Sequence, residues 1–240
     1  MNWGENRCTL IRQIADPLSL TFDVQWVPGK RYVSARVYGP DAKSSPISRK
    51  VTFDIVLGPS NESISQEGIV LGRAKGVPTI LLNAMPDSFL DQLAKADRLS
   101  IGEKGRVLAS LTLPETQKAI DTLRECNNGV LRQWGVDAAA FAALQRAPMP
   151  IGSAADWFTS EDYPTAIIRK GGAGTSVVRL TIGSSGELLA CEPVSKSGHE
   201  LLDRTTCNLL RKRGRYEPAI GADGKPTQAM LIESVSWVMF

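Results

Sequence analysis

Histidine and cysteine, the residues that most often bind transition metals, are scarce in this sequence of 240 residues. There is one histidine, His199, and there are four cysteines with no Cys-x-x-Cys pair among them. Structural zinc sites need more closely spaced ligands, so we expect neither a metal nor another cofactor. A Ser-His-Asp triad would have to use His199, which stands at the expected start of a helix, where a solvated residue is the simpler interpretation. The sequence therefore indicates no enzyme.

Long apolar runs and a strong charge of either sign are also absent. No apolar run approaches the roughly 18 residues needed to span a bilayer, and the first residues lack the apolar core of a signal peptide. The net charge of +3 is far from the dense positive field of a nucleic-acid-binding protein. We therefore expect no nucleic-acid partner. With 42% hydrophobic and 22% charged residues, the chain has the composition of a globular protein, and its length allows two domains of modest size.

The four cysteines are Cys8, Cys126, Cys191 and Cys207. An even number is compatible with buried free thiols and equally with two disulfides formed in an oxidising compartment. Cys191 and Cys207 lie 16 residues apart, in a predicted strand and a predicted helix that must pack together, so a bridge between them is feasible. Composition alone leaves both interpretations open.

The first part of the chain is rich in predicted strands. Alternating or β-branched segments separated by turn residues indicate strands at 7–14, 18–26, 31–39 and 49–58, followed by two more within 68–86 and one at 106–113. Helical periodicity appears at 87–97, at 114–126 after Pro114, and in a shorter piece at 130–144. The sequence thus predicts a β-rich N-terminal domain, residues 1–145, with its helices late.

Residues 146–162 contain small residues and prolines without a sustained period, which predicts a linker. The C-terminal domain, residues 163–240, then follows a β-β-α-β order, with strands at 175–183 and 187–194, a helix within 197–214 and a last strand at 228–238. The last strand is expected to place Met230, Ile232, Ser234 and Ser236 on one side, and Leu231, Val235 and Trp237 on the other. The predicted fold class is α+β.

The predicted helix has signals at both ends. Ser197 and Glu200 have capping-box spacing, and Gly214 stands where a C-cap is expected. The basic residues Arg211 and Arg213, with a lysine between them, suit the negative end of the helix dipole. An acidic partner or an anionic lipid is the alternative explanation for this basic cluster.

Four stretches occur in a fixed order over about 80 residues: Tyr163-Pro164, GTSVVRLTIGSSGEL from residue 174, SKSGHELLDRTTC from residue 195, and RYEPAIGADGKP from residue 215. This series resembles the C-terminal domain of the TonB family of energy transducers. The resemblance implies a periplasmic location and a Cys191–Cys207 disulfide. It also implies a short segment of an outer-membrane transporter, or of another envelope protein, as the partner.

The resemblance further implies where the partner binds. An edge strand offers unpaired N–H and C=O groups to an extended peptide, so the guest would pair with the last strand, through Gln228, Met230, Ile232, Ser234 and Ser236. Tyr163 and Pro164 would lie nearby. The alternative is a structural envelope protein in which this domain packs within the chain or forms a homodimer through the same edge.

The N-terminal part has a fainter resemblance to uncharacterised periplasmic domains that precede TonB-like modules, and to the invasion-associated locus B group. It rests on "CTLIR" from residue 8, "SFLDQLAKADRLSIG" from residue 88 and "CNNGVLRQWGVD" from residue 126. It implies a Cys8–Cys126 disulfide and no known activity. The membrane anchor and Pro-rich spacer of TonB proteins are not seen here, so membrane attachment is expected only through an anchor outside this sequence.

Overall fold

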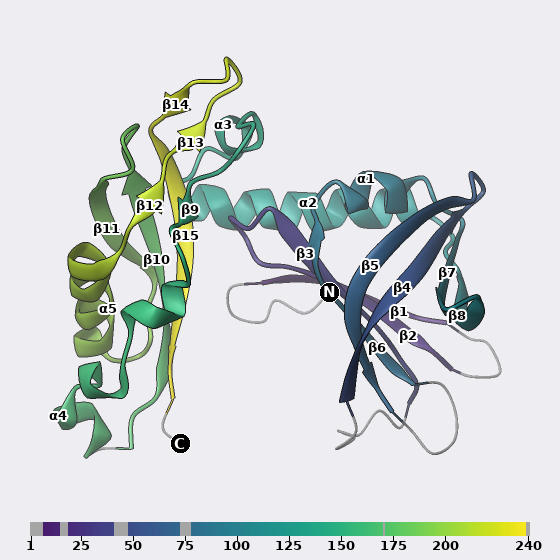
Figure 1. Cartoon of the computed structure of the whole chain (residues 1–240), viewed down its shortest axis with the longest axis horizontal. Coiled ribbons are helices and arrows are strands. Elements are labelled where there is room, and N and C mark those ends of the chain that lie inside the picture. The colour runs from purple at the N-terminus through teal and green to yellow at the C-terminus, as the bar shows by residue number, and fades with distance from the viewer. Residues whose placement is uncertain (1–6, 15–18, 41–47, 73–77, 170, 239–240) are drawn as a thin grey trace. The chain divides into compact units, whose positions relative to one another are not determined.

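The computed structural model describes residues 7–14, 19–40, 48–72, 78–169 and 171–238. The chain divides into two compact units, Met1–Asn128 and Gly129–Phe240 (Figure 1). The predicted boundary after residue 145 lies further along the chain than this division. The reason is that Leu131, Trp134 and Val136 pack with Val177 and Ile232 and so belong to the C-terminal unit.

The N-terminal unit is built on one antiparallel sheet of eight strands in the order β1-β2-β3-β6-β5-β4-β7-β8. The strands are β1 (Cys8–Gln13), β2 (Thr21–Trp26), β3 (Tyr32–Tyr38), β4 (Ser48–Gly58), β5 (Glu62–Leu71), β6 (Thr79–Pro86), β7 (Arg98–Glu103) and β8 (Arg106–Thr112). The helices are α1 (Phe89–Ala94) and α2 (Thr116–Gln133), the second of which continues past the division into the C-terminal unit. The β-rich character and the late helices agree with the predicted fold class.

Alternation places the core of this unit on one face of the sheet. In β3, Val33, Ala35 and Val37 are buried while the residues between them are partly exposed, as expected for a strand covered on one side. The Sγ atoms of Cys8 and Cys126 are bonded, with Cα atoms 6.0 Å apart. This disulfide ties the first strand to α2, and it is the pair that the resemblance implied.

Two elements differ from the sequence-based expectation. β7 was not predicted as a strand, and α2 does not end at Cys126 but continues to Gln133. The Cys-Asn-Asn-Gly stretch from Cys126 has poor helix propensity, yet Cys126 and Asn127 are buried, with exposed fractions of 7% and 3%. Tertiary packing therefore outweighs local propensity at this point.

The C-terminal unit contains a three-stranded antiparallel sheet in the order β11-β10-β15. These strands are β10 (Gly174–Ile182), β11 (Leu188–Ser195) and β15 (Ala229–Trp237), and the helices are α3 (Ala138–Ala142), α4 (Thr165–Ile168), α5 (Glu200–Arg213) and the short 3-10 turns η1 (Ala154–Trp157) and η2 (Ser160–Asp162). Two small ladders pair β9 (Met149–Pro150) with β12 (Tyr216–Glu217), and β13 (Ala219–Ile220) with β14 (Pro226–Thr227). The predicted β-β-α-β order of the domain is confirmed.

Both faces of the small sheet are covered, by different parts of the unit. On one face, Val178, Leu180 and Ile182 of β10 belong to a buried cluster with Cys207 and Leu210 of α5. On the other face, the buried residues Leu131, Trp134, Val136, Val177 and Ile232 form a separate cluster. The sheet is therefore held between α5 and the segment that follows Gly129.

Residues 146–162 are structured rather than extended between domains. They contain β9, η1 and η2, and Trp157 is buried in the cluster beneath α5, with its ring 5.3 Å from that of Tyr216. Asp162 is held by Arg213 at the end of α5, through N···O distances of 2.5 and 2.9 Å. The segment predicted as a linker thus contributes to the core of the C-terminal unit.

The ends of α5 also differ in detail from the expected caps. The N-cap is His199, whose backbone N–H donates to the Ser197 hydroxyl at 3.2 Å, and the carboxylate that accepts the Ser197 N–H belongs to Asp203 instead of Glu200. Gly214 is the C-cap at φ −60°, so no left-handed conformation calls for glycine there. A Cβ at Gly214 would instead lie 2.4 Å from the Leu210 carbonyl oxygen, and this close approach requires the glycine.

Candidate functional site

The outer edge of β15 is the most distinctive feature of the C-terminal unit. Within the described residues, β15 pairs with β10 alone, in an unbroken register from Gly174 opposite Trp237 to Ile182 opposite Ala229. In an antiparallel strand, successive residues direct their N–H and C=O groups to opposite edges. Every second residue of the nine in β15 therefore presents its backbone N–H and C=O away from β10, in a regular row.

The other edge of the same sheet, formed by β11, is unlike this one. β11 contains Pro193, which has no backbone N–H, and its pairing with β10 shifts register at two points, between Val177 and Val178 and between Thr181 and Ile182. Proline and irregular register are common ways in which natural sheets protect an edge from further pairing. Of the two edges, β15 is the one suited to receive another strand.

Side chains of β15 alternate between the two faces as the sequence indicates. Leu231, Val235 and Trp237 belong to the clusters beneath α5 and α4, whereas Ile232 packs into the cluster on the opposite face. Ile232 is only 1% exposed, so a partner at this position could contact its backbone but not its side chain. The remaining predicted contact residues on that face are a partly buried Met230, with Ser234 and Ser236 exposed further along.

The structure brings Tyr163 to the end of β15. Its ring lies 5.3 Å from that of Trp237 in an edge-to-face arrangement, and its hydroxyl donates to the Gly172 carbonyl at 2.6 Å. Phe158 makes a second edge-to-face contact with Trp237, at 6.0 Å. Pro164 is the N-cap of α4 directly after Tyr163. Gln228, the first predicted contact residue, immediately precedes β15 at the other end.

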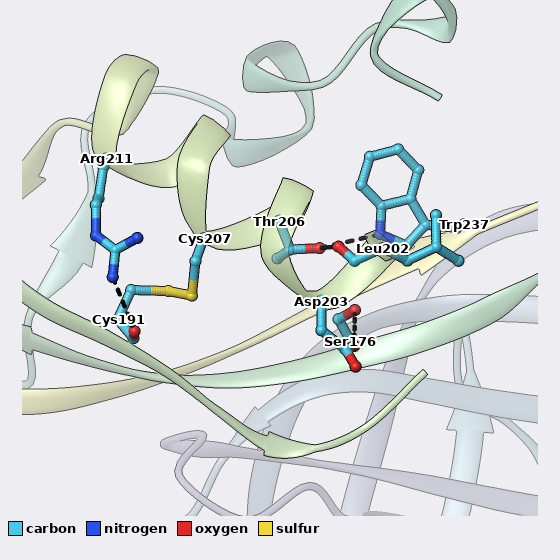
Figure 2. Close-up of a disulfide and its surroundings, with 8 residues drawn as sticks. All are labelled: Ser176, Cys191, Leu202, Asp203, Thr206, Cys207, Arg211 and Trp237. Carbon is cyan, nitrogen blue, oxygen red and sulfur yellow. Dashed lines mark hydrogen bonds between the residues drawn. A yellow bond between two sulfur atoms is a disulfide. The ribbon is translucent and has the colours of Figure 1, made fainter. Parts of the chain in front are cut away.

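Buried polar contacts attach β15 and β10 to α5 (Figure 2). The indole Nε1–H of Trp237 donates to Thr206 Oγ1 at 3.0 Å, and the Thr206 hydroxyl donates to the Leu202 carbonyl at 2.9 Å. Beside them, the Ser176 hydroxyl donates to the Asp203 carboxylate at 2.6 Å. Because Thr206, Ser176 and Asp203 are buried, removing one member of either pair would leave the other without a hydrogen-bond partner, from protein or from water. These pairs were not predicted from the sequence.

The Cys191–Cys207 disulfide fixes the other side of α5. It joins the middle of the helix to β11 with Cα atoms 5.7 Å apart, and Arg211 donates to the Cys191 carbonyl at 3.1 Å (Figure 2). Nearby, burial and the Glu233 carboxylate raise the pKa of the Tyr216 phenol, so this buried hydroxyl stays protonated. The helix is thus attached to β11 covalently and to β10 and β15 by hydrogen bonds.

A groove of about 460 Å³ lies beside the first residues of β15. The lining residues come from the α3 region, from β10, from the β13–β14 hairpin and from the start of β15: Val136, Asp137, Ala140, Phe141, Ala143, Leu144, Thr181, Gly221, Ala222, Thr227, Gln228, Ala229 and Met230. Sequence reasoning missed this groove. Nearly 90 residues separate its two main walls, and a run of alanines carries no local sign of a binding surface.

No group of three or more potential metal-ligating side chains occurs in the described part of the chain. None of the helices within the described ranges is long and apolar enough to cross a bilayer.

Residues 159–239 match the family model for the C-terminal domain of Gram-negative bacterial TonB proteins. This segment is a TonB-like C-terminal domain. The match includes β10, β11, α5 and β15 but neither α3 nor the N-terminal unit. Neither the curated proteins nor the solved structures gave a match to the chain. The family consists of non-enzymatic energy-transducer and binding domains of the periplasm that contact envelope proteins such as outer-membrane transporters. The match thus covers the β-β-α-β segment, about a third of the chain.

Proposed function

We propose that the TonB-like domain binds an extended peptide segment of an outer-membrane transporter, or of another envelope protein, by adding it as a fourth strand beside β15. The observation that carries the proposal is the unbroken ladder of β15, which pairs on one side only among the described residues. Backbone hydrogen bonds along the ladder would supply affinity, and side chains at alternate positions would set preference.

The packing of α5 supports this role because a receiving edge must be rigid before the guest arrives. A thin sheet of three strands is stabilised by few neighbours, yet here the disulfide and the Thr206–Trp237 bond hold it against the helix. Preorganisation of this kind lowers the entropy lost on binding. The helix thus acts as a brace for the edge.

The two disulfides support a periplasmic location. Disulfides persist in oxidising compartments and are rare in the reducing cytosol. Both pairs, Cys8–Cys126 and Cys191–Cys207, are closed in the structure, and the described residues contain no free cysteine. This is the compartment in which the domains of the matched family work.

A homodimer through β15 would use the same edge, and the sequence of the strand disfavours it. In a two-fold symmetric antiparallel pair centred on the middle of β15, Glu233 would stand directly opposite Glu233 of the second copy. Like charges directly opposite each other on neighbouring strands destabilise the pairing. An extended segment from a different protein has no such constraint.

The proposal is tested by selecting nine-residue peptides, the length of β15, from a displayed random library against the full chain. Hydrogen exchange is then followed with and without a selected peptide. We expect alternate amides of β15 to exchange slowly only when the peptide is bound, because every second N–H of the strand faces the open edge. Binding that protects amides elsewhere, or a dimer that protects them without peptide, would contradict the proposal.

Two proline variants provide a matched control. Because N–H groups of adjacent residues face opposite edges, one of Ser234→Pro and Val235→Pro removes a donor at the open edge and the other removes a bond to β10. Thermal unfolding identifies which is which, since loss of a ladder bond lowers stability more. The more stable variant should remain folded and lose peptide binding; unchanged binding by that variant would count against strand addition.

A further inference from the structure

We propose that the groove beside α3 is a specificity pocket that takes one large apolar side chain of the guest strand, at the guest position opposite Met230. This inference rests on the proposed strand addition and goes further, because it assigns a role to residues outside the TonB-like segment. The wall made by Val136–Leu144 precedes residue 159, where the family match begins.

The groove adjoins the edge of β15 that is unpaired within the described residues. Gln228, Ala229 and Met230, which line it, are the residues at which the ladder of β15 begins. A strand paired with β15 over its whole length would therefore run past the mouth of the groove. This continuity identifies the occupant as an extended peptide.

Strand geometry decides which guest side chain enters. Residues directly opposite each other on neighbouring strands project to the same face of the sheet. Met230 projects to the face that carries Val136 and Phe141, as its packing in that cluster shows. The guest residue opposite Met230 must therefore point toward α3, while guest residues opposite Ser234 and Ser236 would lie beside exposed serines. The predicted guest has a large apolar residue at one end and tolerates polar residues at alternate positions toward the other.

The lining of the groove matches an apolar occupant. Phe141, Leu144 and Met230 are each only partly buried, so they keep apolar surface that a guest could cover. Ala140 and Ala143 are exposed and have small side chains, which leave room between them and the sheet. Burial of such surface is the main source of affinity for one side chain.

The walls of the groove are fixed on both sides. Asp137 caps α3 by accepting the N–H groups of Ala139 and Ala140 at 2.9 and 3.1 Å. At the end of α3, the Gln145 backbone N–H donates to the Ile220 carbonyl at 2.9 Å and its side chain to the Ala222 carbonyl at 3.0 Å. The groove is therefore formed before any guest binds.

The attachment of α3 to the sheet depends on the residues just before it. The Arg179 guanidinium on β10 donates to the Trp134 carbonyl at 2.7 Å. The φ of Gly135 is +70°, which favours glycine, and a Cβ there would lie 2.0 Å from Arg179 Nη1 and displace the guanidinium. The wall that α3 contributes is held at a set place over β10.

A second copy of the chain would fill the groove poorly. Two-fold antiparallel pairing of β15 about Glu233 or about Ile232 places Ser236 or Ser234, respectively, opposite Met230. A serine side chain is too small to cover the apolar surface that Phe141 and Leu144 present in the groove. The chemistry of the site favours a guest whose sequence differs from that of β15.

The test uses Ala140→Trp in the full chain, with Ala139→Trp as the matched control. Both alanines are exposed, both lie in the first turn of α3 and both N–H groups donate to Asp137, but only Ala140 lines the groove. The probe is the best nine-residue peptide from the displayed library and its variant with alanine at the preferred apolar position. Affinities are measured by fluorescence anisotropy.

We expect the selected peptides to share one large apolar residue, and alanine at that position to weaken binding to the wild type by about 10- to 100-fold. Ala140→Trp should weaken binding of the apolar peptide by a similar factor and barely affect the alanine peptide, whereas Ala139→Trp should change neither. No shared apolar position, or equal weakening of both peptides by Ala140→Trp, would overturn the pocket.

Hydrogen exchange separates failure of the pocket from failure of strand addition. If β15 amides are protected but no apolar preference is found, strand addition stands and the pocket is wrong. If peptides enter the groove without protecting β15, then both the proposed function and the pairing argument fail. A peptide-free dimer that protects β15 would replace the guest by a second copy and would also overturn the pocket.

Discussion

The N-terminal and C-terminal units differ in how much sheet each contains and in how the sheet edges are treated. The first has eight antiparallel strands, with β1 and β8 at its two edges. The guanidinium of Arg12 on β1 donates a hydrogen bond to the carbonyl of Pro114, which follows β8 in the chain. The second has three strands, with one protected edge at β11 and one regular edge at β15. The regular edge at β15 therefore belongs to a small sheet. More of the rigidity of this sheet must come from the helix attached to it.

The disulfides show the same contrast in the length of chain that each one closes. Cys8–Cys126 spans 118 residues and Cys191–Cys207 spans 16. In the loop-entropy description, a longer closed loop restricts the unfolded chain more. The two crosslinks therefore provide a direct way to compare the units.

The largest expected effect is loss of the long crosslink. Replacing Cys8 and Cys126 together by alanine should lower the free energy of unfolding of the N-terminal unit by about 5 kcal/mol. Hydrogen exchange in a denaturant series, read from peptides of each unit, measures this loss separately from changes in the C-terminal unit. A loss confined to peptides after Gly129 would break the assignment of this crosslink to the N-terminal unit.

Loss of the short crosslink should have a smaller effect on a smaller unit. The double variant Cys191→Ala, Cys207→Ala should lower the free energy of unfolding of the C-terminal unit by about 3 kcal/mol. The same exchange measurement should show faster exchange in α5 and β11 peptides. If this loss equals or exceeds that of the long crosslink, loop length does not explain the difference between the units.

The hydrogen bond between Trp237 of β15 and Thr206 of α5 should contribute less to the free energy of unfolding than either disulfide. Thr206→Val removes the acceptor of the Trp237 indole N–H and leaves it buried without a partner, at a cost of about 1–3 kcal/mol. Thr205→Val is the control, because it makes the same change in helix propensity at a partly exposed neighbour. Chemical denaturation of both variants tests the brace; equal losses would show that the bond does not support β15.

The smallest effect is expected at the ion pair that fastens η2 to α5. Arg213, with hydrogen bonds from Thr159, lowers the pKa of Asp162 to about 2. Since the folded pKa lies below the unfolded value of about 3.9, the stabilisation is complete above that value and is lost as the pH falls toward 2. Asp162→Asn should therefore be less stable than wild type at neutral pH, and the difference in melting temperature should shrink on acidification. A difference independent of pH would contradict the assignment.

Much of the fold could be predicted because its signals are local. The alternating segments that became β1 to β4, β10 and β15 keep their pattern over several residues. The two faces of the last strand followed from the same alternation. Where a signal was short, as in β7, or conflicted with propensity, as at Asn127 in α2, prediction failed because distant packing decided the outcome.

The candidate site was predictable only in part. Its strand, and Tyr163 at the end of that strand, could be named from the sequence series. The burial of Ile232 and the groove beside Met230 could not, because both depend on residues 131–144 folding against β15, nearly 90 residues later. Similarly, Trp157 in a proline-rich stretch gave no local sign that it would enter the core.

The sequence by itself determined most of the strands, the helix of the C-terminal domain and the alternation of side chains along β15, because these depend on neighbours two to four residues apart. Only the tertiary structure decided which edge of the small sheet stays regular and what stands beside it. Those features arise from strand order, from Pro193 in β11 and from the approach of α3, which are contacts between residues far apart in the chain.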